Sequence, residues 1–176
     1  MYRTIIVAVT SLFITQAIAE DQQPVFFSLG LGVINENGLA TPSNISIDDA
    51  FIPKFELGIG WETLLTPVWE FSATATASYA YSNSFDIEGQ DAANNAKIEN
   101  IGLWLDNKLA YSGFSDTIRP FISLGAGKVY GQYSDNENNV SGWATGTRAL
   151  VGLEFDVSKD AKLSFALGTN DIDDIN

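Results

Sequence analysis

The sequence predicts an all-β protein, namely an antiparallel up-and-down transmembrane β-barrel of the eight-stranded type. The first observation is a period of two in which apolar residues alternate with Gly, Ser, Thr or charged residues, as at Val25, Phe27, Leu29 and Leu31. A strand sends successive side chains to opposite faces, so each run has one apolar and one polar face. The polar faces are too polar for a soluble core, which favours a closed barrel in lipid with its apolar face outward.

The second observation is the order of runs and connections. Seven runs cover about residues 24–34, 51–62, 68–82, 98–111, 120–132, 143–157 and 161–168. Long polar stretches alternate with short turns, which lie at 63–67, 112–116 and 158–160. Outer-membrane barrels have long loops outside the cell and tight turns in the periplasm, so we expect the first run to start at the periplasmic side.

The third observation is that outward aromatic residues gather at the two ends of the runs. The group near the short turns comprises Phe27, Trp61, Trp69, Tyr111 and Phe155. The group near the long loops comprises Phe51, Tyr79, Tyr81, Tyr130 and Trp143. Two aromatic girdles at the two interfaces are typical of membrane barrels.

The N-terminus predicts a signal peptide over residues 1–19 and a barrel domain over residues 20–176. Arg3 is followed by an apolar stretch over 5–14 and by the small-x-small sequence at 17–19. The alternative, a membrane anchor, is disfavoured because a spanning helix needs about 20 apolar residues.

Composition argues against several kinds of chemistry. The chain has no Cys and no His, which argues against disulfides, Ser-His catalysis and the usual zinc sites. Its net charge of −13 disfavours nucleic acid. We predict no enzyme activity, no cofactor and no metal. A carboxylate pair, Glu62 with Glu70, and a weak Ca²⁺ loop at 135–139 are the alternatives; a structural ion pair and a solvated loop are the favoured interpretations.

Charged residues on the inward phase are the candidate site. They are Lys54, Glu56, Glu62, Glu70, Asp106, Lys108, Arg148, Glu154, Asp156 and Lys162. One interpretation is an ionic gate in a narrow pore. The favoured one is a packed, salt-bridged plug, because eight strands enclose only enough room for side chains. Buried charges must be paired, so we expect Arg148 to contact at least one acidic residue, namely Glu56, Asp106 or another inward position, and we expect Trp104 to fill the lumen.

Two stretches carry a family resemblance. Residues 119–127, Arg-Pro-Phe-Ile-Ser-Leu-Gly-Ala-Gly, resemble the Pro-aromatic-x-Gly-x-Gly strand of small outer-membrane β-barrel proteins of the opacity and OmpA-like type. Residues 146–155 are similar to the strand that follows it. The resemblance implies the outer membrane of a Gram-negative bacterium, outer-membrane lipid and lipopolysaccharide as neighbours, and assembly by the barrel insertion machinery. That fold hosts adhesins, envelope-stabilising proteins, small pores and a few lipid enzymes.

The chain departs from this family at its end. The family has eight strands and ends in an aromatic residue, whereas seven clear runs are followed here by an acidic tail. We expect residues 169–176 to be exposed and irregular and the C-terminal strand to be missing. The seam between the first and seventh runs is then unpaired or closed under strain; a tail that acts as a substitute strand is the alternative.

The sequence favours a structural or surface-interaction role, in adhesion or envelope integrity. The acidic extracellular loops are the expected contact surface for a host or surface partner, because no catalytic group is present. The alternative is a small pore for small or hydrophobic solutes.

Overall fold

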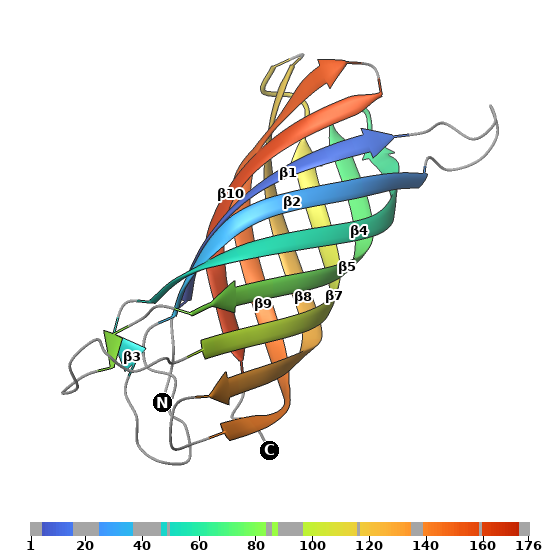
Figure 1. The fold of residues 1–176 in the computed structure, drawn as a ribbon. Helices are drawn as coiled ribbons and strands as arrows, with labels where there is room; N and C mark the ends of the chain where they lie inside the picture. The colour runs from blue at the N-terminus through green and yellow to red at the C-terminus, as the bar shows by residue number, and fades with distance from the viewer. Residues whose placement is uncertain are drawn as a thin grey trace.

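The computed structural model describes residues 5–15, 25–36, 47–48, 50–83, 86–87, 97–115, 117–134, 139–158 and 160–172. The eight long strands are β1 (Ile5–Thr15), β2 (Val25–Glu36), β4 (Ala50–Thr66), β5 (Trp69–Ser82), β7 (Lys97–Tyr111), β8 (Ile118–Ser134), β9 (Asn139–Ser158) and β10 (Ala161–Ile172). They close into a barrel in the order β1-β10-β9-β8-β7-β5-β4-β2, and every pair is antiparallel (Figure 1). Within the described ranges, no helix has the length and apolar character needed to cross a membrane.

The two faces of the wall follow the predicted alternation. Outward side chains are well exposed, for example Leu103 at 58% and Leu124 at 62%. Inward side chains such as Thr76, Trp104 and Ser164 are buried. An apolar outer face and a polar lumen are the arrangement that lipid requires, so the predicted phase and the predicted fold class are confirmed.

The seam between β2 and β10 differs from the expectation, because β1 fills it. Ile5 to Ile14 pair with residues 161–170 of β10, and Ile6 to Thr15 pair with residues 26–35 of β2. Without β1, both edges would present unpaired N–H and C=O groups to lipid. The segment is rich in Ile, Val and Thr, which favour strands. This pairing belongs to the uncleaved chain; removal of residues 1–19 stays a prediction.

The end of the last strand also differs from the expectation. We expected residues 169–176 to be irregular, but β10 continues to Ile172 and Asn170 is buried. Asn170 pairs with Ile5 of β1 and with Arg148 of β9. Pairing with β9, which continues to Ile172, together with β1 as far as Asn170, carries the strand beyond the last apolar alternation. Residues 173–176 lie outside the described residues.

A second, two-stranded sheet lies outside the barrel wall. It pairs β3 (Ile47–Asp48) with β6 (Asp86–Ile87), within stretches that we expected to be irregular loops (Figure 1). Two-residue strands are too short to carry a period-two signal, which explains why the sequence does not predict them.

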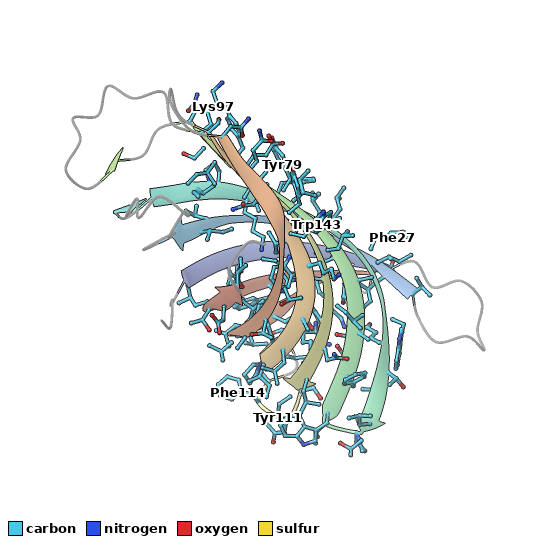
Figure 2. The ribbon with its side chains drawn as sticks, turned by 90° about the horizontal axis from the view of Figure 1, so that it is seen from below. Phe27, Tyr79, Lys97, Tyr111, Phe114 and Trp143 are labelled. Carbon is cyan, nitrogen blue, oxygen red and sulfur yellow. The ribbon has the colours of Figure 1, made fainter. Side chains whose placement is uncertain are left out.

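Aromatic side chains lie near both ends of the barrel. We call the end with the short β4–β5, β7–β8 and β9–β10 connections the turn end, and the opposite end the loop end. Tyr111 and Phe114 lie at the end opposite to Tyr79 and Lys97 (Figure 2). The Trp69 and Tyr111 rings are 4.8 Å apart at the turn end, and the Tyr130 and Trp143 rings are 5.4 Å apart toward the loop end.

The other members of the two aromatic groups also follow the outward phase where their side chains are described. Phe27, Trp61 and Tyr81 are exposed, and Phe155 packs against Phe165 with ring centroids 5.9 Å apart. The side chain of Phe51 lies outside the described residues. The role of both groups as interfacial girdles stays a prediction.

Candidate functional site

The lumen contains all ten charged residues that the alternation places on the inner face. Eight of them are buried: Lys54, Glu56, Glu70, Asp106, Lys108, Arg148, Glu154 and Lys162. The other two, Glu62 and Asp156, are half-buried. The register divides these residues between a group toward the loop end and a group at the turn end.

The first group, which we call the Arg148 cluster, consists of Lys54, Glu56, Asp106 and Arg148. The Arg148 guanidinium donates through Nε to Asp106 Oδ1 at 2.5 Å and through Nη1 to Glu56 Oε1 at 2.6 Å, and Nη2 also bonds Asp106. Lys54 Nζ lies 2.6 Å from the same Glu56 oxygen. The guanidinium on β9 is buried and bonds carboxylates on β4 and β7. These bonds link three strands of the barrel wall across the lumen.

Trp104 closes the lumen beside this cluster. Its indole N–H donates to Ser78 Oγ at 3.1 Å, and the Arg148 guanidinium lies 4.9 Å from the ring centroid, within cation–π range. The ring lies against Gly127 and Gly146, where a Cβ would approach its carbons to 2.8 and 3.0 Å. Glycine at these two positions makes room for an indole across the lumen, as the inward phase of Trp104 predicts.

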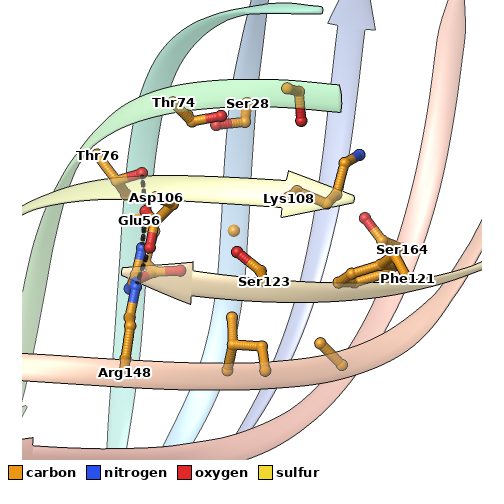
Figure 3. A pocket seen from close by; sticks show the side chains of 14 residues that line it. Ser28, Glu56, Thr74, Thr76, Asp106, Lys108, Phe121, Ser123, Arg148 and Ser164 are labelled. Atoms are coloured by element: carbon orange, nitrogen blue, oxygen red, sulfur yellow. Dashed lines mark hydrogen bonds and ion pairs between the residues drawn. The ribbon is translucent and has the colours of Figure 1, made fainter. Parts of the chain in front are cut away.

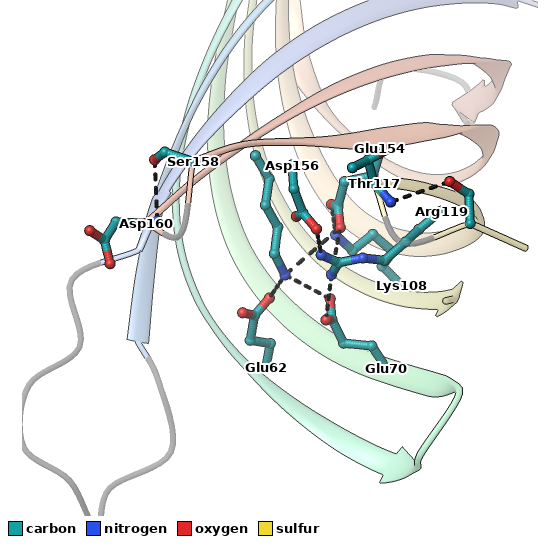
Figure 4. A network of polar contacts seen from close by, with 11 residues as sticks. Glu62, Glu70, Lys108, Thr117, Arg119, Glu154, Asp156, Ser158 and Asp160 are labelled. Carbon is teal, nitrogen blue, oxygen red and sulfur yellow. Dashed lines mark hydrogen bonds and ion pairs between the residues drawn. The ribbon is translucent and has the colours of Figure 1, made fainter. Parts of the chain in front are cut away.

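The second group, the Lys162 cluster, lies at the turn end (Figure 4). It consists of Glu62, Glu70, Lys108, Arg119, Glu154, Asp156 and Lys162. Lys162 Nζ donates to Glu62 at 2.6 Å and to Glu70 at 2.9 Å. Lys162 bridges both carboxylates and Arg119 also bonds Glu70, so Glu62 and Glu70 belong to a network of ion pairs and are not a free acid–base pair.

Arg119 is the lumen residue that the sequence analysis missed. Its guanidinium donates to Glu70 at 2.8 Å, bonds Asp156 and lies 3.7 Å from Glu154. We began the strand at residue 120, whereas β8 begins at Ile118. Phe121 faces inward, and residues two positions apart on a strand share a face, so Arg119 also faces the lumen. The alternation would therefore have identified Arg119 if the strand had been started two residues earlier.

A small polar cavity separates the two clusters (Figure 3). Its volume is about 70 Å³, and hydroxyl-bearing residues such as Ser28, Thr74 and Ser123 line it between Arg148 and Lys108. Each water molecule occupies roughly 30 Å³ in the liquid, so the cavity has room for about two waters and not for a continuous file of them. The lumen is therefore a filled interior with an ion-pair layer on each side of the cavity.

Paired charges dominate the described lumen. Its five cationic and six anionic side chains are engaged with one another. Within the described ranges, no group of three or more carboxylate, imidazole or thiol ligands is placed to hold a metal ion. This arrangement pairs buried charges with one another. The pairing offsets the free-energy cost of removing these charges from water.

Gly125 offers a test of how tightly the Arg148 cluster is packed. A Cβ at this position would overlap the Asp106 carboxylate and lie 2.9 Å from Arg148 Cγ. We expect Gly125→Ala to lower the free energy of unfolding by about 1–3 kcal/mol, because both neighbours are held by hydrogen bonds and cannot move freely. Urea titration in detergent micelles measures it. Ala126→Val, which adds carbon on the lipid side of the next residue, is the control and should leave the midpoint nearly unchanged.

Comparisons with known proteins place the chain in a family. Among solved structures, it is similar to Ail, the attachment invasion locus protein of Yersinia pestis (10% identity, TM-score 0.42, 97% of each chain), and to Ail in complex with the heparin analogue sucrose octasulfate (11%, 0.39, 97% of each). It is also similar to the outer membrane protease OmpT from Escherichia coli (7%, 0.37, 97% of this chain and 93% of that one). No curated protein matches the sequence. The family described as outer membrane protein beta-barrel domain matches residues 5–176, so the chain belongs to that family.

Proposed function

We propose that this barrel is a non-conducting, non-enzymatic anchor in the outer membrane of a Gram-negative bacterium, and that its loops act in adhesion or envelope integrity. The observation that supports this most is the filled lumen. Trp104, Phe121 and Val129 are buried inside it, and the ion pairs of two clusters cross it. A barrel whose interior is occupied by side chains leaves the ends of the strands, and so the loops, as the part available for contact.

The charge of the loop sequences defines the kind of contact. Asp48, Asp49, Asp86, Glu88 and Asp91 belong to the two longest loop stretches, and the chain as a whole carries a net charge of −13. Such a surface attracts partners with exposed positive charge, and salt screens that attraction. A basic host or envelope surface is therefore the partner class that we propose, alongside lipopolysaccharide around the wall and the insertion machinery during assembly.

Planar-bilayer recording tests the filled lumen. We expect the 176-residue chain, reconstituted in its folded form, to give no discrete current steps above the protein-free bilayer. The physical reason is that an ion must break paired charges in a space that holds about two waters. Stable unitary currents from the unmodified chain would contradict the anchor proposal.

Cell binding tests the loops. We expect bacteria that display the chain to bind a surface coated with a basic protein, and binding to fall several-fold when Asp48, Asp49, Asp86, Glu88 and Asp91 are all replaced by the matching amides. Added salt should reduce binding by the unmodified chain, because salt shortens the Debye length and so weakens the attraction between surface charges. Equal binding by both chains would contradict a role for loop charge. Unchanged heat-modifiable migration controls for folding of the barrel.

A small pore is the second candidate, and one observation favours it. Glu56 lies 2.6 Å from both Arg148 and Lys54, so Lys54 can hold this carboxylate if Arg148 swings away. That exchange would widen the cavity toward Trp104, whose ring must also move before a path reaches the loop end. In this case the unmodified chain conducts, and Arg148→Ala raises the open fraction; an absence of current in both chains rejects the pore.

A further inference from the structure

Asn107 is a polar residue on the lipid side of the wall. It lies on β7 and is exposed, and the next outward residues on the same strand are Leu105 and Leu109. Its partners across the two ladders are Ala73 of β5 and Leu124 of β8. An amide is thus surrounded by apolar side chains on the face that this outer-membrane barrel turns to hydrocarbon.

The depth of Asn107 removes water as a partner. Asn107 lies four positions before Tyr111, which the predicted girdle puts at the turn-end edge of the apolar band. For a strand tilted by about 40°, this spacing corresponds to on the order of 10 Å from that edge. Lys128, another outward polar residue, has a long side chain and lies two residues from Tyr130, so it can reach the interface. The short Asn107 side chain cannot.

The amide also has no partner within the chain. Among the described residues, none makes a hydrogen bond with the Asn107 side chain. An amide in an apolar medium without hydrogen bonds is unfavourable, and the acyl chains of lipids at this depth offer neither a donor nor an acceptor. A polar group of a neighbouring protein in the membrane would supply the missing hydrogen bonds.

We propose that a second copy of this chain covers Asn107 in a symmetric dimer within the membrane. Both copies insert with their loops on the same side, so a two-fold axis between them runs along the membrane normal and residues of equal depth meet. Asn107 then faces Asn107. An amide carries both donors and an acceptor, so the two side chains form reciprocal N–H···O=C bonds, which a carboxylate or an ammonium could not do with its own copy.

The wall on the β5 side of Asn107 carries small side chains. The outward face of β5 carries Ala73, Ala75 and Ala77, and Ala126 lies on β8 beyond Leu124. Small side chains let two walls in lipid come close enough for short polar side chains to meet, which is the usual character of contacts within membranes.

Cysteine cross-linking tests the contact directly, because the chain has no Cys of its own. We expect Asn107→Cys to form a disulfide-linked dimer in native membranes under mild oxidation. The matched control is Leu167→Cys, which is equally lipid-facing but lies on β10, three strands away around the wall. Cross-linking no greater than that of the control, or a product that contains a different protein, would overturn the proposal.

A second experiment tests whether the Asn107 amide stabilises the dimer. Energy transfer between labelled copies is measured in lipid vesicles over a dilution series of protein in lipid. Asn107→Leu should shift the dimer midpoint toward higher protein density by about 3- to 30-fold, the range expected for one hydrogen-bonded contact in a membrane. Asn107→Gln keeps an amide and should retain most of the association. An unchanged midpoint for Asn107→Leu overturns the proposal. Both substitutions face lipid, and heat-modifiable migration verifies that each variant is folded.

Discussion

Arg148→Ala will destabilise the barrel by about 3–5 kcal/mol, because it leaves the Asp106 and Glu56 carboxylates in a poorly hydrated lumen without their shared cation. Thr76 donates to Asp106 at 3.1 Å but carries no charge to replace the guanidinium. Lys54 still pairs with Glu56 in this variant, so Asp106 is the carboxylate that is left without a cation. A fall in the urea midpoint of the detergent-folded protein measures the effect.

Two further variants show whether the loss of stability is due to the missing guanidinium. Arg148→Lys should recover only part of the stability, since an ammonium cannot bond two carboxylates with a planar fork. Thr147→Ala, at the adjacent outward position on β9, should be close to neutral. Equal midpoints for Arg148→Ala and the unmodified chain would mean that the cluster contributes nothing to stability.

Removal of residues 1–19 will prevent the remaining chain from folding into a compact barrel by itself. The ladders that β1 makes with β2 and β10 would be lost together, which leaves rows of backbone N–H and C=O groups facing hydrocarbon at several kcal/mol for each group. Semi-native gel electrophoresis measures this. We expect the 176-residue chain to show the heat-modifiable shift and the chain of residues 20–176 to lack it.

Proline substitutions and an added strand complete this experiment. Val9→Pro, in the middle of β1, should weaken the shift, whereas Gln22→Pro, between the bounds of β1 and β2, should not. Joining a strand of alternating apolar residues that ends in Phe to residues 20–176 should restore the shift. If residues 20–176 migrate as a folded barrel without help, closure does not need β1.

The fold could be predicted because a lipid-facing wall constrains every second residue. That constraint places Trp104, Arg148 and the other inward charges without any knowledge of the pairing. The partners of Arg148 were predictable only as a choice among Glu56, Asp106 and the other inward acidic residues, because the alternation gives the side of the wall and not the relative height of the strands. Register settles the choice, and Arg148 contacts both.

The parts that could not be predicted depend on contacts distant in sequence. An apolar stretch of about ten residues fits both a signal-peptide core and a membrane strand, and the alternation does not show that in the uncleaved chain it pairs across the seam between β2 and β10. The added length of β10 depends on its pairing with β9 to Ile172. The β3–β6 pairing joins two loops and leaves no periodic trace in either one.

The seam also determines how the barrel must assemble. Every other ladder of the wall joins long strands that follow one another along the chain, whereas β1 and β10 bring Ile5 beside Asn170. The entropy of closing a loop grows with its length, and contacts between distant residues slow folding. The hairpins can therefore form an open, curved sheet first, and we expect β1–β10 pairing to be the final and slowest step. Substitutions confined to that ladder should then change the time taken to close more than the time taken to form the sheet.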